Sequence, residues 1–337
     1  METRFPEHRL AAQAAFESAL GGKARLAVTG ATGWLGSAVV AMALRAGIGP
    51  GDDRLRAYAS RAGELDTEAG SVPLEALDQA RPLEGPNWIV WHFAALGKER
   101  TVGLPPEEFV AANTAILEAA FRVMAAADRP RMVYSSSGAV YGADGHPPRL
   151  DQDPYGHVKG LQERAVLDWC AARDIPLVLP RVFNVGGPHG NKLNLYALSS
   201  LAQAALAGEA PTVAARGPVF RSYVHIEELI AVLAHRVSRD ATGIATPFDT
   251  AGREVVEIGD LAARVCDAAG LCPADVQRDY DPDRPASWYV GDARTYQVAV
   301  QAAGLTPIPL SAIVADTLAS LAPSSGSAIL RRDPRAL

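Results

Sequence analysis

The chain has 337 residues, more than one hydrophobic core usually serves, so we expect two lobes or a core with a large appendage. Its content of 48% hydrophobic and 21% charged residues is that of an ordinary globular protein. The formal net charge is -6 at pH 7 and the basic residues form no run, which gives no support to nucleic-acid binding.

Two further features exclude other classes of protein. No apolar run reaches the roughly 18 residues of a membrane span, and acids and a proline occur early in the chain, where a secretory signal would be apolar. The three cysteines, Cys170, Cys266 and Cys272, lack a metal-ligand spacing, which indicates reduced thiols. We therefore expect a cytoplasmic protein that binds no nucleic acid, membrane or metal.

Residues 5–20 are rich in alanine and have helical periodicity, and Gly21 and Gly22 end the pattern. We expect a short helix that lies outside the main fold, and we assign residues 1–22 to an N-terminal helical extension. Its expected role is packing, not chemistry.

The clearest motif is a glycine-rich turn between a strand and a helix. Residues 25–29 form a short apolar strand, GATGWLG follows at 30–36, and an apolar helix follows the turn. Glycine permits a tight turn and a close backbone approach to a pyrophosphate, while the helix N-terminus offers free N–H groups and a positive dipole end. This context predicts dinucleotide binding. The turn residues assigned to the cofactor are Gly30, Thr32, Gly33, Trp34, Leu35 and Gly36.

The end of the next strand, at residues 55–59, indicates which dinucleotide is bound. An NAD-binding fold usually places an acidic residue there for the ribose 2′-hydroxyl, whereas this chain has Ser60 and Arg61. A guanidinium beside a hydroxyl suits a 2′-phosphate. We therefore favour NADP as the cofactor, with NAD as the alternative.

Strands and helices alternate through the first half of the chain. The elements predicted next are a loose polar stretch at 62–87 with a short strand at 71–74, a strand at 88–95, a helix at 106–127 and a strand at 131–134. The strand at 88–95 is almost entirely apolar, as expected of a parallel strand covered on both faces, and His92 within it is expected to be a core histidine. This alternation predicts a Rossmann-type, doubly wound parallel sheet.

The strand at 131–134 leads into three serines and, after a loop, into Tyr155 and Lys159 at the start of a helix. Residues four apart lie on one face of a helix, a turn apart. A nearby ammonium favours the ionised form of a phenol, so we expect Lys159 to lower the pKa of Tyr155. Such a phenol can move a proton to or from a carbinol near neutral pH.

After a further strand at 175–183 the regular alternation loosens. The elements predicted there are helices at 194–207, 226–238 and 257–269, a strand at 211–214, and a helix from Asp292 to near Gly304. They predict a smaller C-terminal lobe at the carboxyl edge of the sheet, where open α/β sheets bind ligands. We assign residues 23–185 to a dinucleotide-binding domain, 186–325 mainly to a substrate-binding lobe from which some segments can return to the sheet, and 326–337 to a tail.

Six motifs together resemble one known superfamily. They are GATGWLG at 30–36, HFAAL at 92–96, YSSSGAVYG at 134–142, YGHVK at 155–159, RVFNVGGP at 181–188 and RSYVHIEEL at 221–229. In this order they resemble the extended short-chain dehydrogenases/reductases, the nucleotide-sugar epimerase/dehydratase superfamily, and within it the UDP-sugar 4-epimerases and sugar 4-ketoreductases. The resemblance extends from Leu26 to about Leu321.

The resemblance implies roles for individual residues. Tyr155 is the implied acid/base, Lys159 tunes it and holds the nicotinamide ribose, and Ser137 bonds the reacting sugar oxygen. The residues implied in cofactor binding beyond the first two motifs are Ala94, Ala95, Lys98, Asn113, Tyr155, Lys159 and Val182. The residues implied in substrate binding are Ser137, Asn184, Arg221 and Arg284, the last three at the nucleotide diphosphate. Two arginine forks also match phosphate oxygens on physical grounds.

Departures from the superfamily pattern narrow the reaction. The sugar 4,6-dehydratases carry an Asp-Glu pair after the catalytic hydroxyl, where this chain has Gly138 and Ala139, so elimination is disfavoured. Ser222 follows Arg221 in place of the usual aspartate, and residues 284–287 read RPAS in place of RPGD.

The expected function is therefore NAD(P)-dependent hydride transfer at a ring carbon, C4, of a nucleotide-activated sugar, by a 4-ketoreductase or a 4-epimerase. Ser60 and Arg61 favour the reductase, because such epimerases usually retain NAD. The alternatives are a reductase of a non-sugar carbonyl and a non-enzymatic dinucleotide sensor or scaffold. We expect a homodimer through the helices at 106–127 and 155–172, as in related proteins.

Overall fold

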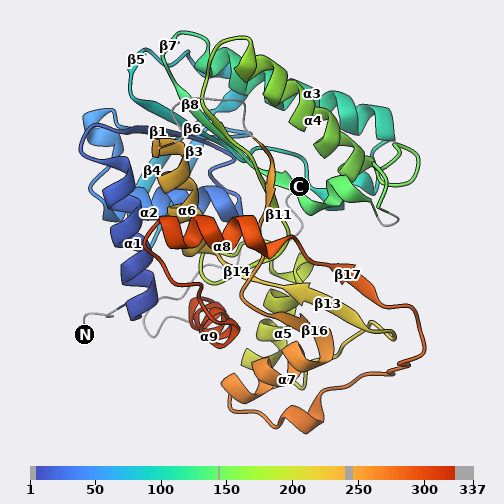
Figure 1. Cartoon of the computed structure of the whole chain (residues 1–337). Helices are drawn as coiled ribbons and strands as arrows, with labels where there is room; N and C mark the ends of the chain where they lie inside the picture. Colours follow the sequence, from blue (N-terminus) through green and yellow to red (C-terminus); the bar gives the residue numbers. More distant parts are fainter. Residues whose placement is uncertain (1–4, 143–144, 240–245, 323–337) are drawn as a thin grey trace.

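In the computed structural model of the chain, residues 5–142, 145–239 and 246–322 are described (Figure 1). Within these residues a seven-stranded sheet carries the larger part of the fold. In sheet order its strands are β10 (Leu177–Val178), β8 (Arg131–Tyr134), β6 (Trp88–His92), β1 (Arg25–Thr29), β2 (Leu55–Ala59), β4 (Gly70–Ala76) and β3 (Gly63–Thr67). Neighbouring strands are parallel except β3 and β4.

The strand order reverses beside β1, since the chain builds outward through β2 on one side and through β6 and β8 on the other. Open α/β sheets bind ligands at the carboxyl ends of the strands at such a switch point. The predicted Rossmann-type, doubly wound sheet is confirmed, and the switch point shows where its site is expected.

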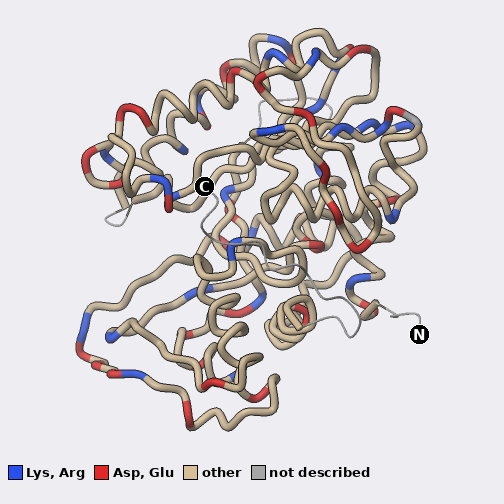
Figure 2. The backbone as a smooth tube through the Cα atoms, turned by 180° about the vertical axis from the view of Figure 1, so that it is seen from behind, with Lys and Arg blue, Asp and Glu red and all other residues tan. Residues whose placement is uncertain are grey.

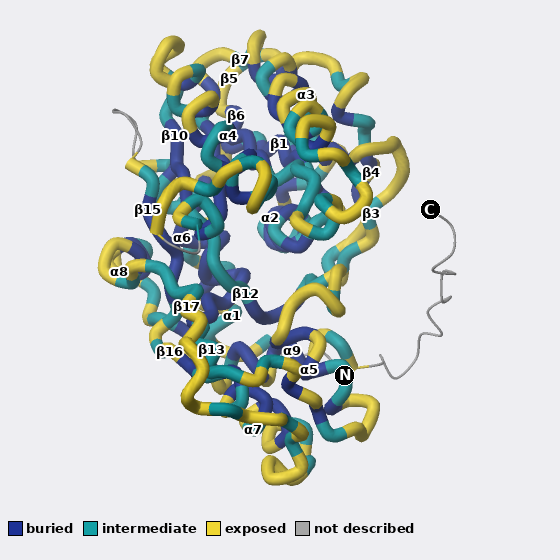
Figure 3. The backbone as a smooth tube through the Cα atoms, turned by 90° about the vertical axis from the view of Figure 1, so that its right-hand side faces the viewer, coloured by how far each residue is buried: buried dark blue, intermediate teal, exposed yellow. Residues whose placement is uncertain are grey.

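Both faces of the sheet are covered, as the apolar strand at 88–95 predicts. Trp91 of β6 joins one core with α2 (Trp34–Arg45) and α6 (Ile226–Arg239), whereas Val90 joins a second core with α3 (Pro106–Met124) and α4 (Pro154–Ala171). The helices lie on the two sides of the sheet in Figure 1, and the sheet strands are largely buried in Figure 3. Alternate side chains of a parallel strand point to opposite faces, so β6 contributes to both cores.

The N-terminal helix α1 (Glu7–Leu20) is part of the main core. Its apolar residues Ala12, Phe16 and Leu20 are buried, and it packs along α6. The expectation that this helix lies outside the main fold is therefore wrong. Its apolar stripe is narrow among many alanines, but α6 offers a complementary surface that the sequence of α1 alone does not reveal.

The stretch at 62–87 is more regular than predicted. The strand expected at 71–74 lies within β4, but β3 precedes it and forms an antiparallel hairpin at the edge of the sheet. Glu64 and Asp66 of β3 are exposed and Leu65 is half-buried. An edge strand with one solvent-exposed face has few apolar residues, which is why the sequence pattern indicates a loop here.

A C-terminal lobe has its own core, in which α5 (Ala197–Leu206), α7 (Ile258–Ala268) and α9 (Leu310–Leu321) pack together. In the described residues, β16 (Val255–Glu257), β13 (Val219–Ser222) and β17 (Ser287–Tyr289) form one small sheet of this part. The remaining strands, in pairs or threes, are β15 (Phe248–Asp249), β11 (Pro180–Val182) and β9 (Ser136–Ser137); β12 (Val185–Gly186) and β14 (Val224–His225); and β5 (Gly85–Pro86) and β7 (Ala127–Asp128). The short 3-10 helices are η1 (Pro50–Asp52), η2 (Leu77–Gln79), η3 (Lys98–Thr101), η4 (Gly138–Tyr141), η5 (Leu193–Leu195) and η6 (Pro273–Asp275).

Most helices predicted in this half are confirmed, and α8 (Ala293–Ala302) begins as expected at Asp292, whose side chain accepts the Arg294 N–H at 3.0 Å. The strand predicted at 211–214 is wrong, because only one isolated bridge, from Thr212 to Gln277, occurs there. Helix α9 is not among the predicted elements. Because α6 packs on the large sheet and β15 pairs with β11, C-terminal segments return to the first part of the fold; the domain boundaries themselves stay a prediction.

Acidic and basic residues are interspersed over the molecule in Figure 2. No helix in the described ranges has the length and apolar character that crossing a membrane requires.

Candidate active site

The glycine-rich turn joins β1 to α2 at the switch point of the sheet. Gly30 has φ +68°, and a Cβ there would lie 2.7 Å from the backbone N of Ala94. A Cβ on Gly36 would collide with the carbonyl oxygen of Gly30 and lie 2.8 Å from the Cα of Ala31. Because side chains are excluded here, bare backbone and the start of α2 lie at the carboxyl edge of the sheet. This cradle fits the pyrophosphate of a dinucleotide.

Gly36→Ala is expected to lower the free energy of unfolding by about 1 to 3 kcal/mol, because the added methyl pushes α2 away from the turn. It should also weaken dinucleotide binding by about tenfold, since the backbone N–H groups at the start of α2 would no longer point at the pyrophosphate. Thermal unfolding and fluorescence titration with NADH and NADPH measure both effects.

Gly160→Ala is the matched control, because Gly160 also lies in a helix, α4, but a Cβ added there would have nothing within 4 Å. The added methyl should stabilise that helix by up to about 1 kcal/mol. Unchanged stability and dinucleotide affinity in Gly36→Ala would contradict the steric argument.

The other residues predicted to hold the cofactor surround this turn, in different ways. Ala94 lies two residues after the end of β6, against Gly30. Asn113 is buried in α3, where it accepts the Leu96 N–H at 2.9 Å and donates to Phe109 O at 3.0 Å, so it shapes the loop after β6. Its side chain is fully buried and makes both of these bonds to backbone groups, which favours a supporting role over direct cofactor contact.

Trp34 directs its indole N–H to the carbonyl of Pro188 at 2.6 Å, so this side chain holds the loop after β12. Thr32 is exposed and its carbonyl accepts a hydrogen bond from Asn191. These two contacts join the glycine-rich turn to the segment that leads into the C-terminal lobe.

Ser60 and Arg61 are exposed directly after β2, next to β1 and at the same sheet edge as the turn. Lys98 is exposed at the start of η3. Of the remaining predicted cofactor residues, Leu35, Ala95 and Val182 are half-buried.

The three predicted catalytic residues come from β9 and α4. The side chain of Asp153 caps α4 by accepting the Gly156 N–H at 3.1 Å, and a Cβ on Gly156 would lie 2.5 Å from the carbonyl of Ala139. Helix α4 therefore begins in close contact with η4, which brings Tyr155 to Ser137. Ser137 acts to lower the pKa of the Tyr155 phenol, against the larger effect of burial.

Lys159 is buried, and its ammonium donates to the carbonyl of Ser135 at 3.0 Å. Burial lowers the pKa of Lys159 to about 8, against the opposing charge of Glu163. The lysine thus keeps its charge at neutral pH while lying against the strand that carries Ser137.

The predicted direction of the Tyr155 pKa shift is wrong for this structure. Burial raises the pKa of Tyr155 above its ordinary value of 10.0, and the hydrogen bond with Ser137 offsets this only in part. The ammonium of Lys159 is directed to Ser135 O instead, and desolvation of the phenol dominates. The phenol therefore stays protonated at neutral pH and is ready to act as an acid.

A polar network that the motifs did not identify, buried at Glu163 and Ser136, supports these residues. Glu163 of α4 accepts from Ser136 at 2.5 Å and from Arg181 at 2.7 and 2.9 Å. Arg181 also donates to the Tyr141 hydroxyl at 2.8 Å, which donates in turn to Asp249 at 2.8 Å. The network ties α4 to three neighbouring strands and holds the Ser137 strand in place. In the sequence, the sign of this network is Arg181, a charged residue within the apolar strand at 175–183.

The predicted substrate residues come together in part. Asn184 donates to Ser222 O at 3.0 Å and to Tyr289 O at 3.3 Å, and the Arg221 guanidinium lies 5.8 Å from the Tyr289 ring centre. Arg221 donates to backbone carbonyls and has no carboxylate partner among the described residues. Burial lowers its pKa. Arg284, by contrast, lies in an exposed loop and pairs with Asp281 at 3.3 Å.

Tyr289 is a site residue that sequence reasoning missed. It is the last residue of β17, and its hydroxyl lies 3.1 Å from the Ser137 hydroxyl. Nothing in the polar segment before it marks this tyrosine, since only the pairing of β17 with β13 brings it to the reacting centre.

Comparison with known proteins agrees with this arrangement. Residues 26–246, well over half of the chain, match the family described as NAD dependent epimerase/dehydratase. The chain belongs to this family. It is thus an enzyme of the extended short-chain dehydrogenase/reductase type, as the motifs predict, and a nicotinamide dinucleotide is its cofactor. No curated protein sequence matches the chain.

Solved structures share the fold of this epimerase/dehydratase family member. A UDP-N-acetylglucosamine 4-epimerase from Methanobrevibacter ruminantium M1, in complex with UDP-N-acetylmuramic acid, has a TM-score of 0.67 and 18% identity over 89% of this chain and 98% of its own. A UDP-glucose 4-epimerase from Thermotoga maritima, with UDP-glucose, has a TM-score of 0.66 and 18% identity over 88% and 98%. The dTDP-glucose 4,6-dehydratase DesIV from Streptomyces venezuelae, with NAD, has a TM-score of 0.64 and 19% identity over 88% and 96%.

Two groups of described residues in this family member have the composition of a metal site, but their hydrogen bonds are those of charge networks. His225 accepts the Glu227 N–H on Nδ1 at 3.2 Å, so its Nε2 carries the hydrogen and donates it to Asp316 at 3.1 Å. A protonated nitrogen offers no lone pair to a cation. In the second group, His189 with Glu68 and Glu227, Glu227 is already bound by two arginines.

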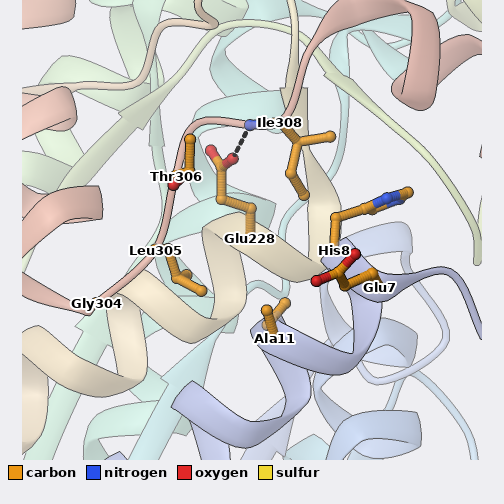
Figure 4. Close-up of a pocket in the computed structure, with 9 residues that line it drawn as sticks. Glu7, His8, Ala11, Glu228, Gly304, Leu305, Thr306 and Ile308 are labelled. Atoms are coloured by element: carbon orange, nitrogen blue, oxygen red, sulfur yellow. Dashed lines mark hydrogen bonds between the residues drawn. The ribbon is translucent and has the colours of Figure 1, made fainter.

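A cavity of about 350 Å³ lies away from the reacting centre, between α1 and the loop from α8 to α9 (Figure 4). Its wall includes Glu228, which accepts the Ile308 N–H at 2.7 Å and the Tyr296 O–H at 3.0 Å. Burial raises the pKa of Glu228 to about 7. Because no residue assigned to cofactor or substrate lines this cavity, the candidate active site remains the carboxyl edge of the sheet beside the glycine-rich turn.

The predicted core histidine is confirmed. His92 is buried, its Nδ1 lies 2.7 Å from the Thr29 hydroxyl, and burial lowers its pKa to about 3. It is therefore neutral and takes no part in acid/base chemistry at neutral pH.

Proposed function

We propose that the enzyme transfers hydride between a nicotinamide dinucleotide and C4 of a nucleotide-activated sugar, as a 4-ketoreductase or a 4-epimerase. The observation that carries the proposal is that the start of α4, with Tyr155, packs against β9 and η4, which carry and follow Ser137, at the sheet edge where the glycine-rich turn lies. Arg221, a guanidinium without an acidic partner in the described chain, adds a place for a diphosphate. The epimerases from M. ruminantium and T. maritima are described with UDP-linked sugars, which supports this substrate class.

The bound dinucleotide supplies or accepts the hydride. Tyr155 gives its proton to the carbonyl oxygen in reduction and takes it back in oxidation. Ser137 donates a hydrogen bond to the oxygen as negative charge develops on it. Lys159 keeps a positive charge close to this proton transfer. In a 4-epimerase, the keto-sugar would present its other face before Tyr155 returns the proton.

Elimination of water is disfavoured on steric grounds as well as by residue type. A Cβ on Gly138 would lie 2.5 Å from the Phe183 ring, so an acidic side chain at this position would displace that ring. The first acid of the pair that a 4,6-dehydratase carries would therefore need Phe183 to move. This favours reduction or epimerisation within the family.

We propose NADP as the preferred cofactor, because Ser60 and Arg61 are exposed at the end of β2. Arg61→Ala is expected to raise the Kd for NADPH by about tenfold, since one charge-assisted contact to the 2′-phosphate is lost. The Kd for NADH should stay within about twofold. Fluorescence titration measures both, with Arg264→Ala on α7 as the surface control. NAD that stays bound through purification and desalting would overturn the preference.

The function itself is tested by turnover with UDP-, dTDP-, GDP- and CDP-sugars in the presence of each dinucleotide, followed by chromatography of the products. Arg221→Ala should raise KM for the converted sugar by about tenfold or more while kcat changes little, because a diphosphate contact acts mainly on binding. Arg284→Ala should have a smaller effect, since Arg284 is exposed and paired with Asp281. If both variants leave KM unchanged, the substrate carries no diphosphate, and a non-sugar carbonyl becomes the better candidate.

We also propose a homodimer that forms through α3 and α4, which lie side by side (Figure 1). Phe121 of α3 stacks on Trp169 of α4 with ring centres 4.4 Å apart, which holds the two helices as one surface. Ala111 and Ala115 are exposed on α3, and such small residues permit close helix packing. Light scattering at micromolar concentration should give twice the chain mass; a monomer would contradict the proposal.

A further inference from the structure

The hydroxyl of Ser137 has more neighbours than its hydrogen can serve. A serine hydroxyl has one hydrogen to donate and two lone pairs that accept. The Ala139 N–H donates to Ser137 Oγ at 3.2 Å, which takes one lone pair. One phenol lies at hydrogen-bond distance, since the Tyr289 hydroxyl is 3.1 Å from Ser137 Oγ. Ser137 also acts to lower the pKa of Tyr155, the direction expected when its hydrogen is donated to that phenol. The remaining lone pair and the single hydrogen of Ser137 are therefore divided between Tyr289 and the reacting centre.

The direction of these bonds matters for the chemistry. If Tyr289 donates, the last lone pair of Ser137 is filled and the single hydrogen is left for Tyr155 or for the reacting oxygen. If Ser137 donated to Tyr289 instead, it would have no hydrogen left to donate to Tyr155 or to the reacting oxygen. Burial raises the pKa of Tyr289, so its phenol keeps its hydrogen and can serve as the donor. A hydroxyl that accepts a hydrogen bond is also a stronger donor, because chains of hydrogen bonds polarise one another.

Tyr289 is held from the C-terminal lobe. In the parallel pair of β17 and β13 it lies opposite Arg221, and its carbonyl accepts from Asn184 at 3.3 Å. Its ring packs on Phe183 with ring centres 4.7 Å apart. The position of its hydroxyl therefore depends on the same strands that carry the candidate diphosphate residues.

We propose that Tyr289 is a positioning residue, whose phenol donates to Ser137 and thereby leaves the single Ser137 hydrogen for Tyr155 or for the reacting oxygen. The effect on catalysis rests on the proposed function. The hydrogen bond from Tyr289 to Ser137, by contrast, is expected in the free protein, without substrate. The contact also links the two parts of the site, because β17, which pairs with the strand of Arg221, carries the Tyr289 hydroxyl to Ser137.

The test reads the phenol at position 155 directly, without substrate. Tyr155 is replaced by 3,5-difluorotyrosine, which is more acidic than tyrosine and therefore titrates in an accessible pH range, and its ionisation is followed by 19F NMR. Tyr289→Phe keeps the ring on Phe183 and removes only the hydroxyl. We expect it to raise the pKa at position 155 by about 0.5 to 1 pH unit, because Ser137 becomes a weaker and less directed donor to the phenolate.

The route through Ser137 is tested by a double-mutant cycle. In a Ser137→Ala background, Tyr289→Phe should shift the pKa at position 155 by less than about 0.2 pH unit, since the relay is already broken. Tyr280→Phe, at an exposed tyrosine of the same lobe, is the control and should cause no shift. Thermal unfolding of each variant reports whether the fold is kept.

Two results would overturn the proposal. A folded Tyr289→Phe variant with an unchanged pKa at position 155 would show that Tyr289 does not act on this centre. An equal shift with and without Ser137 would show that Tyr289 acts directly on Tyr155. Both pKa measurements are made without substrate, so they are valid whether or not the enzyme acts on nucleotide sugars.

Once the converted substrate is identified, Tyr289→Phe should lower kcat about tenfold and leave KM within about threefold.

Discussion

Replacing Tyr155 by phenylalanine is expected to lower kcat by about a thousandfold, because the substrate oxygen then has no phenol to exchange a proton with. The ring remains, so the half-buried position between α4 and η4 keeps its packing. KM for the sugar and the Kd for the dinucleotide should change little, since both ligands are bound by other residues. Steady-state kinetics in the reductive direction, with dinucleotide binding measured separately, checks this result.

The matched control is Tyr280→Phe, which removes the same hydroxyl from an exposed tyrosine. Its kcat should equal that of the wild type. If Tyr155→Phe keeps more than about a tenth of the activity, the proton comes from another group, since general acid–base catalysis usually contributes about 10² to 10⁴-fold. If it keeps the full biological activity of the protein, the alternative of a dinucleotide sensor regains support.

Glu227→Gln is expected to lower the free energy of unfolding by about 3 to 5 kcal/mol, the usual cost of removing one partner of a buried ion pair. Glu227 is fully buried and accepts from Arg9 of α1 at 2.7 Å and from Arg45 of α2 at 2.6 Å, with His189 at 3.2 Å. The variant removes the buried carboxylate that both guanidinium groups share and leaves them only the more exposed Glu68, at 3.8 Å from Arg9 and 3.4 Å from Arg45. Chemical denaturation at pH 7 measures the change.

The same carboxylate predicts a pH dependence of stability. Burial opposes ionisation of Glu227, but the hydrogen bonds from Arg9 and His189 and the charge of Arg45 hold the pKa of this carboxyl well below its ordinary 4.5. A depressed pKa gives stability that is present above the unfolded value and is lost as the pH falls below it. The wild type should therefore lose stability below about pH 5 more steeply than Glu227→Gln.

Glu17→Gln is the control for both measurements, because Glu17 lies on the exposed side of α1. Its free energy of unfolding should stay within about 0.5 kcal/mol of the wild type. If Glu227→Gln proved equally mild, the cluster would not anchor α1, and the apolar contacts of Phe16 would carry that helix alone.

What the sequence by itself determined are the features that depend on neighbours along the chain. The glycine spacing at 30–36 needs only a strand before it and a helix after it, and the turn is where those residues place it. The apolar run at 88–95 predicts a central parallel strand because only burial on both faces accounts for it. The four-residue spacing of Tyr155 and Lys159 likewise predicts a shared helix face. The ordered motifs were enough to identify the family.

Features that depend on distant segments were decided by the tertiary structure alone. Tyr289 reaches Ser137 across 152 positions of the chain, through the pairing of β17 with β13. The Tyr155 pKa rises rather than falls because burial is a property of the folded whole, and the sequence shows only that a lysine is near. Helix α1 joins the core because α6, more than 200 residues later, offers it an apolar face and Glu227. Local pattern therefore located the chemistry, whereas packing over long sequence separations set the protonation state of the acid, its hydrogen-bond partners and the anchoring of the first helix.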